Sequence, residues 1–148
     1  ELVQSALEFS DTSAHDILMP WDKVVKVSRA MRTEEILTVI RDNVHSRLPV
    51  VDEQDHPVGM LQIRKFLKAY LKGPVQLDKI IDECRFVSAS TAIDDLLPLM
   101  SAQRTQIAIV TDEDGETLGI VTVEDILEEL VGEIYDEDDK VEAGGNAQ

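Results

Sequence analysis

The feature that most constrains this sequence is an internal repeat with a shift of 60 residues. Gly59 and Gly119 are each followed by a short run of mostly apolar residues, and the match continues in both directions without a gap. Further matched pairs are Val27 with Val87, Ile36 with Leu96, Ile40 with Met100, Val50 with Val110, Asp52 with Asp112, and Phe66 with Ile126. So many apolar and acidic positions in one register indicate a duplication, in which two copies share one fold.

Each copy predicts the same order of elements, β-α-β-β-α. Alternating apolar residues indicate the strands, and apolar residues at helical spacing indicate the helices. The first copy predicts strands near 24–27, 48–51 and 57–63 and helices over 36–44 and 63–70; the second predicts strands near 85–87, 107–111 and 117–123 and helices over 96–100 and 126–131.

Two positions in the second copy carry stronger local predictions. Asp114-Gly115 predicts a tight hairpin turn between the last two strands. The acidic residues around it faintly resemble a calcium loop, but the glycine comes too early and no acidic residue stands at the twelfth position, so a turn is favoured. Pro98 lies inside a predicted helix, which it should kink or shorten.

The predicted fold class is mixed α/β (α+β), with the two units packed face to face about a pseudo-two-fold axis. One unit of about 50 residues buries too little surface to be stable alone. Clefts between two such units are where ligands usually bind. The expected organisation is a helix or linker from a preceding, absent domain (1–15), the first motif (16–72), a connector and the second motif (73–134), and an acidic mobile tail (135–148).

Composition excludes several functional classes. The net charge of −16 argues against nucleic acid and anionic membrane surfaces as partners. The single Cys84 allows neither an internal disulfide nor a cysteine-based zinc site, and the three histidines lack metal-ligand spacing. No apolar run reaches the roughly 20 residues that span a bilayer. Since no nucleophile elbow, Walker A loop or GxGxxG occurs, we expect no catalytic residues, no metal ligands and no enzymatic activity.

Thr122 and Asp125 stand where the last strand meets the last helix, and they support two compatible interpretations. In a capping box, the Thr hydroxyl and the carboxylate satisfy free N–H groups at the helix start. In a sugar clamp, the carboxylate accepts hydrogen bonds from two vicinal ribose hydroxyls, and the helix N-terminus favours a nearby phosphate. The first copy has Gln62 and Lys65 at these positions, which predicts one competent site and one degraded site.

Four other residues are candidates for ligand contacts. Arg47 opens a strand and is either a surface residue or a phosphate ligand, for which its planar fork of donors is suited. Met19 is either core filler or a flat apolar contact for adenine. Pro49 and Ala108 are expected as strand residues whose backbone could contact the edge of a base.

The duplicated unit, with its Gly-apolar-apolar-Thr-x-x-Asp pattern, resembles the CBS motif, and the pair resembles a Bateman module. Three segments are similar to the CorC/HlyC/TlyC proteins, hemolysin-like bacterial relatives of the CNNM magnesium transport mediators. These segments are residues 7–20, 45–50 (HSRLPV) and 119–134 (GIVTVEDILEELVGEI).

This resemblance implies a regulatory module of a membrane protein linked to magnesium or cobalt transport. The implied ligand is AMP or ATP, the latter with Mg²⁺, held by Thr122 and Asp125 at the ribose, Arg47 at the phosphate and Met19 at the adenine. The implied partners are a second copy in a homodimer and the membrane domain of the parent chain, with the module on the cytoplasmic side. The alternative is a ligand-free dimerisation scaffold, in which Thr122 and Asp125 only cap a helix.

Overall fold

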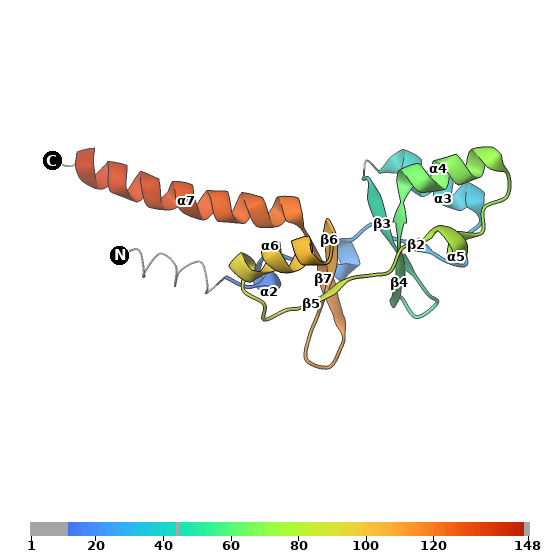
Figure 1. The fold of residues 1–148 in the computed structure, drawn as a ribbon, viewed down its shortest axis with the longest axis horizontal. Coiled ribbons are helices and arrows are strands. Elements are labelled where there is room, and N and C mark those ends of the chain that lie inside the picture. The colour runs from blue at the N-terminus through green and yellow to red at the C-terminus, as the bar shows by residue number, and fades with distance from the viewer. Residues whose placement is uncertain (1–11, 44, 147–148) are drawn as a thin grey trace. The chain divides into compact units, whose positions relative to one another are not determined.

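The computed structural model describes residues 12–43 and 45–146 and places side chains up to residue 135. Its elements, in chain order, are α2 (Ala14–Ile17), β1 (Met19–Pro20), the 3-10 turn η1 (Trp21–Lys23), β2 (Val27–Ser28), α3 (Thr33–Asp42), β3 (Arg47–Val51), β4 (Pro57–Gln62), α4 (Ile63–Lys72), α5 (Leu77–Ile80), β5 (Phe86–Ser88), α6 (Ile93–Ala102), β6 (Ile107–Thr111), β7 (Thr117–Thr122) and α7 (Val123–Asn146) (Figure 1). The predicted order β-α-β-β-α occurs twice, from β2 to α4 (the first repeat) and from β5 to α7 (the second repeat), which confirms the mixed α/β class.

The chain divides into two compact units that do not follow the repeat boundaries expected from the sequence. Unit 2 comprises residues Lys23–Cys84, and unit 1 comprises the residues up to Asp22 together with those from Arg85 onward. Each unit therefore contains one repeat and the segment that leads into the other repeat. We call α2 with β1, and α5 with the residues up to Asp82, the two lead-in segments.

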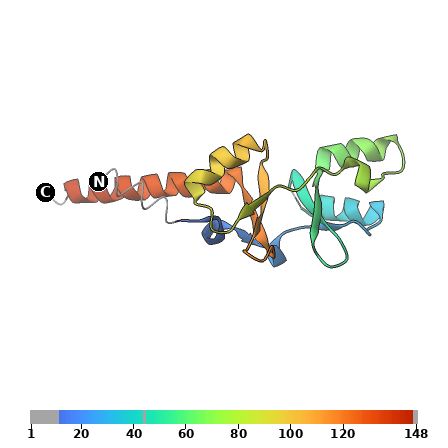
Figure 2. The ribbon, with the colours of Figure 1, turned by 60° about the horizontal axis from the view of Figure 1, so that its bottom comes forward.

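Unit 2 is built on the three-stranded sheet β2-β3-β4, in which β2 runs parallel and β4 antiparallel to β3. Helices α3 and α4 lie side by side in both views (Figures 1 and 2). Ile36 of α3 and Phe66 of α4 belong to one buried cluster with Val27, Leu48 and Leu61 of the strands. Leu77, Ile80 and Ile81 of the lead-in segment pack against that cluster.

Unit 1 repeats this arrangement and adds one strand. Its sheet has the order β1-β7-β6-β5, where β5 is parallel to β6 and both other pairs are antiparallel. The buried cluster again joins strands and helices through Val110, Val121, Leu96 and Ile126. Ala14 of α2 is fully buried in it, so this lead-in segment completes the core of the repeat it does not precede.

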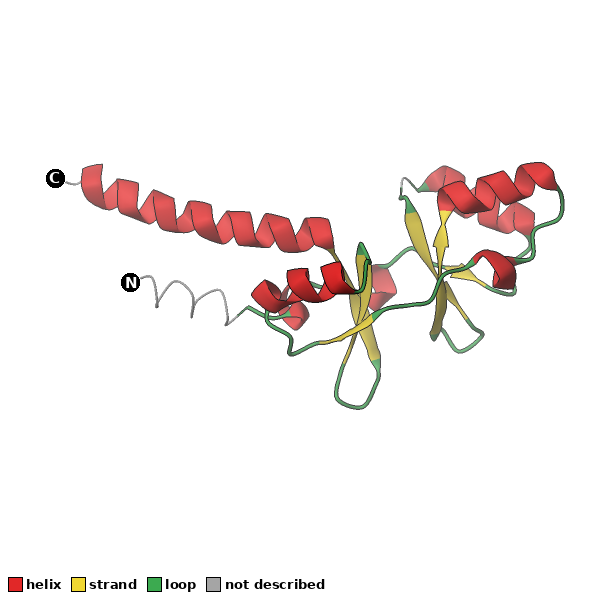
Figure 3. Ribbon diagram, in the orientation of Figure 1, coloured by secondary structure: helices red, strands yellow, loops and turns green. Residues whose placement is uncertain are grey.

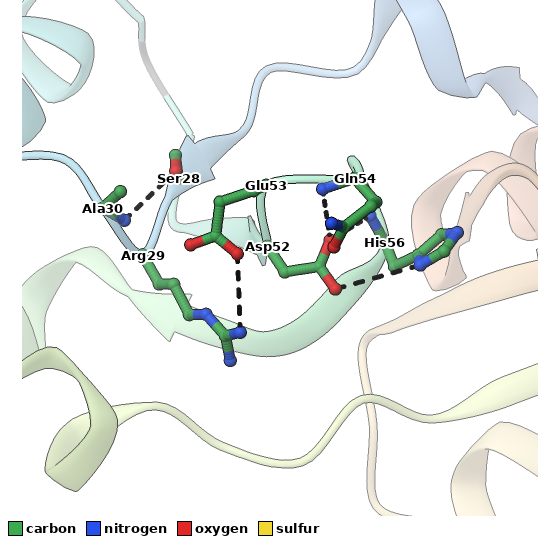
Figure 4. Close-up of polar contacts among 7 residues, drawn as sticks. All are labelled: Ser28, Arg29, Ala30, Asp52, Glu53, Gln54 and His56. Carbon is green, nitrogen blue, oxygen red and sulfur yellow. Dashed lines mark hydrogen bonds and ion pairs between the residues drawn. The ribbon is translucent and has the colours of Figure 1, made fainter.

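The hairpin turns of the two repeats are built alike, as predicted for the second. Asp112 Oδ1 accepts hydrogen bonds of 2.9 Å from the N–H groups of Asp114 and Glu116, and Gly115 has φ +82°. In the first repeat the Asp52 carboxylate accepts the corresponding bonds from Gln54 and His56, also at 2.9 Å (Figure 4).

Three expectations need correction. The last helix does not give way to a tail after residue 134, because α7 is one continuous helix to Asn146 (Figure 3). The segment lacks proline and contains good helix formers such as glutamate and alanine, while its only adjacent glycine pair comes at the helix end. Pro98 does not shorten its helix, since α6 is ten residues long, as is α3. The connector over 73–81 contains a short helix, α5, that was not predicted.

Two other predictions fall outside the described structure. The helix or linker expected over 1–15 lies mostly outside the described residues. Residue 44, the last position of the helix predicted over 36–44, lies outside them as well. Within the described part of the chain, no helix is long and apolar enough to cross a membrane.

Candidate ligand-binding corner

Thr122 ends β7 and caps α7. The strand is fixed by its pairing with β6, in which Thr122 lies opposite Ile107. The next residue, Val123, donates its N–H to the carbonyl of Gln106 at 3.0 Å, so the chain leaves the sheet at a defined point. Thr122 Oγ1 then accepts a hydrogen bond of 3.1 Å from the N–H of Asp125. This is the capping bond predicted from the sequence.

The carboxylate of Asp125 does not complete the capping box. At α2 and α3 the acid three residues into the helix bonds back to the N–H of the capping residue, from Ser13 to Asp16 at 2.9 Å and from Arg32 to Glu35 at 3.1 Å. The partly exposed Asp125 carboxylate has no such bond, nor any ion pair, with the described residues. Its oxygens therefore remain able to accept hydrogen bonds from a ligand.

Met19 lies beside β7, the strand that ends at Thr122, because β1 pairs with β7. Met19 is opposite Ile120, and Pro20 is opposite Gly119. The approach is so close that a Cβ atom at Gly119 would overlap the carbonyl oxygen of Met19. Paired residues share a sheet face, and so do alternate residues along a strand, so Met19 and Thr122 lie on the same face. The Met19 side chain is 42% exposed, which leaves its thioether accessible.

Ala108 and Pro49 are buried strand residues, as expected. Ala108 is 1% exposed, and its side chain belongs to the core cluster of unit 1 rather than to the face of Thr122. Pro49 lies opposite Met60 in unit 2. Because proline has no backbone N–H, only its carbonyl could contact a base.

Arg47 begins β3 in unit 2, where it lies opposite Gln62. Its side chain is partly buried and forms no ion pair with any described residue. The guanidinium is therefore available to an anion. Of the six predicted ligand residues, Met19, Thr122, Asp125 and Ala108 belong to unit 1, while Arg47 and Pro49 belong to unit 2.

We call the place where Met19, Thr122 and Asp125 lie the corner of unit 1. Its counterpart in unit 2 contains Gln62, Lys65 and a residue that the sequence did not single out, Asp82. Asp82 lies opposite Met60, as Met19 lies opposite Ile120, and its carboxylate accepts a hydrogen bond of 2.7 Å from Gln62 Nε2. Lys65 Nζ lies 3.4 Å from the other carboxylate oxygen. A signal for Asp82 exists, because the lead-in segments also repeat, with a shift of 63 instead of 60: Ile17-Leu18 corresponds to Ile80-Ile81.

Other chemistry has little support among the described residues. No group of three or more His, Cys, Asp or Glu side chains there could hold a metal ion. Burial raises the pKa of the Cys84 thiol to about 11, so that it stays protonated near neutral pH and is a poor nucleophile.

Comparison with known proteins identifies the family. The CBS domain family matches residues 14–72 and 78–132, which is most of the chain and one match per repeat. The chain belongs to the CBS domain family. The similarity to CBS pairs of CorC-type proteins, inferred above from the sequence, is likewise confirmed by relatives and by solved structures.

Three of these similar proteins bear on function. The magnesium and cobalt efflux protein CorC of Escherichia coli K12 is 34% identical over 96% of this chain and 51% of its own length. The CBS domain of a bacterial CNNM/CorC family Mg²⁺ transporter, solved in complex with ATP, is 32% identical with a TM-score of 0.78, over 89% of this chain and 96% of the other. A CBS-domain pair with bound AMP from Klebsiella pneumoniae is 27% identical with a TM-score of 0.71, over 81% and 98%. This chain spans between a third and a half of the curated relatives it matches.

Proposed function

We propose that this CBS pair is a regulatory module that binds AMP or ATP at the corner formed by Met19, Thr122 and Asp125, and that it performs no catalysis of its own. The observation that carries the proposal is the Asp125 carboxylate, which has no bonding partner among the described residues, unlike Asp16 and Glu35 at the starts of α2 and α3. The ATP- and AMP-bound relatives support this ligand class.

The residues of the corner fit the ribose and phosphate of a nucleotide. The Asp125 carboxylate accepts hydrogen bonds from both vicinal hydroxyls of a ribose. The Thr122 hydroxyl accepts from the Asp125 N–H and still has its own hydrogen to donate to a ligand oxygen. The positive end of the α7 dipole favours a nearby phosphate, and Met19 offers a polarizable apolar contact for adenine.

Arg47 is proposed as the phosphate contact on the basis of the family resemblance and its lack of an ion pair among the described residues. Two single substitutions, each titrated with AMP and with adenosine, separate its role from that of Asp125. The substitution Arg47→Ala should weaken AMP binding and leave adenosine binding unchanged, because adenosine has no phosphate. Asp125→Ala should weaken both ligands alike, since both contain the ribose diol.

For the parent protein we propose the magnesium- or cobalt-transport role given for CorC, with this module on the cytoplasmic side of the membrane and paired with a second copy. ATP would bring Mg²⁺ as its counter-ion. To regulate transport, the nucleotide must bind one arrangement of the module more tightly than another, because a ligand with equal affinity for both shifts nothing.

The decisive experiment is calorimetric titration of the chain with AMP, ADP and ATP, the last with and without Mg²⁺. We expect saturable binding near one nucleotide per chain. Asp125→Ala and Asp125→Asn should weaken it at least about tenfold, because each hydrogen bond to a charged acceptor contributes about 1.5–3 kcal/mol. Glu124→Ala is the matched control, since it removes a neighbouring exposed acid and should leave affinity unchanged.

The alternative function, a dimerisation scaffold without a ligand, makes a different prediction. Asp125→Ala would then affect neither nucleotide affinity nor the state of association, and no adenine nucleotide would bind the unaltered chain. Analytical ultracentrifugation of the unaltered chain and of Asp125→Ala, each with and without nucleotide, distinguishes the two functions. A dimer that forms without binding any nucleotide would contradict the sensor and favour the scaffold.

A further inference from the structure

We infer that Asp82 closes the first repeat to anionic ligands by filling its corner with a carboxylate from the chain itself. The starting point is the equivalence of the two corners. Gln62 and Lys65 follow β4 into α4 as Thr122 and Asp125 follow β7 into α7, each pair at the shift of 60. In both units a lead-in residue pairs with the same strand position, Met19 with Ile120 and Asp82 with Met60.

The side chain at that lead-in position differs in kind between the units. Met19 has an apolar, exposed side chain, and the Asp125 carboxylate of the same unit has no bond among the described residues. Asp82 instead extends over its own corner, where one carboxylate oxygen lies 2.7 Å from Gln62 Nε2 and the other 3.4 Å from Lys65 Nζ. The Gln62 amide and the Lys65 ammonium therefore already bind the Asp82 carboxylate, whereas Arg47, opposite Gln62, forms no ion pair among the described residues.

The backbone holds Asp82 in this position. Its N–H donates to the carbonyl of Met60 at 2.8 Å, and its carbonyl accepts from the N–H of Met60 at 2.9 Å. The ion pair with Lys65 would contribute little by itself, because both side chains are over 40% exposed. The anchored backbone, however, keeps the carboxylate at a high effective concentration next to its donors, and a free anion must compete with it.

Asp82 also repels an incoming anion. A phosphate that approached Lys65 would come within a few ångströms of a second negative charge, and one of the two N–H groups of the Gln62 amide is already held by the carboxylate. We conclude that the lead-in residue decides which repeat is open. The inference takes the ligand class, a phosphate-bearing molecule, from the proposed function, but it does not require the second repeat to bind nucleotide.

The test uses inorganic phosphate as the probe and the side-chain amide signals of Gln62 in ¹⁵N NMR spectra as the readout, assigned by comparison with Gln62→Ala. Chloride at equal ionic strength is the salt control. Every chain in the test carries Arg47→Ala, because the guanidinium opposite Gln62 is itself a proposed phosphate contact, and the chain with this change alone is the reference chain. In the reference chain phosphate should not shift these signals. In Asp82→Ala they should shift saturably, and the further change Lys65→Ala should abolish that response.

Two more variants keep the test decisive. Asp82→Asn preserves the size of the side chain and should also respond to phosphate, which covers the case in which Asp82→Ala unfolds. Asp78→Ala removes one exposed negative charge from α5 of the same lead-in segment and should behave like the reference chain.

The inference is overturned by a phosphate response in the reference chain, by no response in a folded Asp82 variant, or by an equal response in Asp78→Ala. Failure of the proposed function would appear differently. Nucleotide affinity would then not depend on Asp125, while the Gln62 signals would still respond to phosphate as expected.

Discussion

The two repeats share one framework but differ in the chemistry of their corners. Their strands and helices match at the shift of 60, their turns use the same Asp carboxylate, and Phe66 and Ile126 occupy equivalent buried positions. Their corners share no functional side chain, with Gln62 and Lys65 in one and Thr122 and Asp125 in the other. The comparison teaches that core and turn positions fix this fold, whereas function depends on a few positions at the strand ends.

The largest effect that separates the repeats is expected at the two matched glycines. In Gly119→Ala the new Cβ meets the backbone carbonyl of Met19, which cannot move without detaching β1, so we expect a loss of about 1–3 kcal/mol in unfolding free energy. In Gly59→Ala the new Cβ lies 2.6 Å from Cδ1 of Ile81, the end of a flexible side chain. We expect a smaller loss there, below about 1 kcal/mol, partly offset by the lower backbone entropy of alanine.

Urea unfolding of both variants measures this difference. Because β1 carries Met19, Gly119→Ala should also weaken nucleotide binding, while Gly59→Ala should not. Equal destabilisation of the two variants would mean that β1 is not held closely against β7, and the description of the second-repeat corner would need revision.

How far the sequence predicts this molecule depends on the distance over which each contact acts. Strand β6 was predicted to the residue and β3 and β7 to within one, because alternating apolar residues carry that information locally. The sequence did not predict that each lead-in segment packs in the unit of the other repeat. The pairing of Met19 with Ile120 joins residues about a hundred positions apart and leaves no local pattern. Asp82 was missed for a related reason: three extra residues shift its segment out of the 60-residue register.

A smaller effect is expected at the turns, where Gly115 and Asp55 occupy the same position with φ +82° and +66°. Nothing lies within 4 Å of a Cβ at Gly115, so Gly115→Ala should cost about 1–2 kcal/mol from the left-handed backbone alone. Asp55→Gly relieves that backbone cost but loses the 3.4 Å ion pair with Lys26, so its net effect should stay within about 0.5 kcal/mol. Thermal unfolding of both variants checks this, and a larger loss from Asp55→Gly would show that the ion pair, not the turn, dominates.

The smallest effect concerns charge around the first turn. The backbone N–H of His56, then that of Gln54, and then the charges of His56 and Arg29 hold the pKa of Asp52 below its usual value against the opposing effect of burial (Figure 4). The stability that ionised Asp52 contributes is therefore present above the pKa of this carboxyl in the unfolded chain, about 3.9. It is lost as the pH falls through the lower pKa of Asp52 in the folded chain.

The second repeat has Glu116 and Ala89 at the positions of His56 and Arg29, so its turn keeps the backbone bonds without these cations. The double substitution His56→Glu with Arg29→Ala copies that arrangement into the hairpin turn of the first repeat. It should raise the pKa of Asp52 only part of the way to its usual value, because the N–H bond from residue 56, the largest contribution, is retained. A ¹³C NMR titration of the Asp52 carboxyl measures this. A complete return to the usual pKa would mean that side-chain charge, and not the turn shared by the two repeats, controls the group.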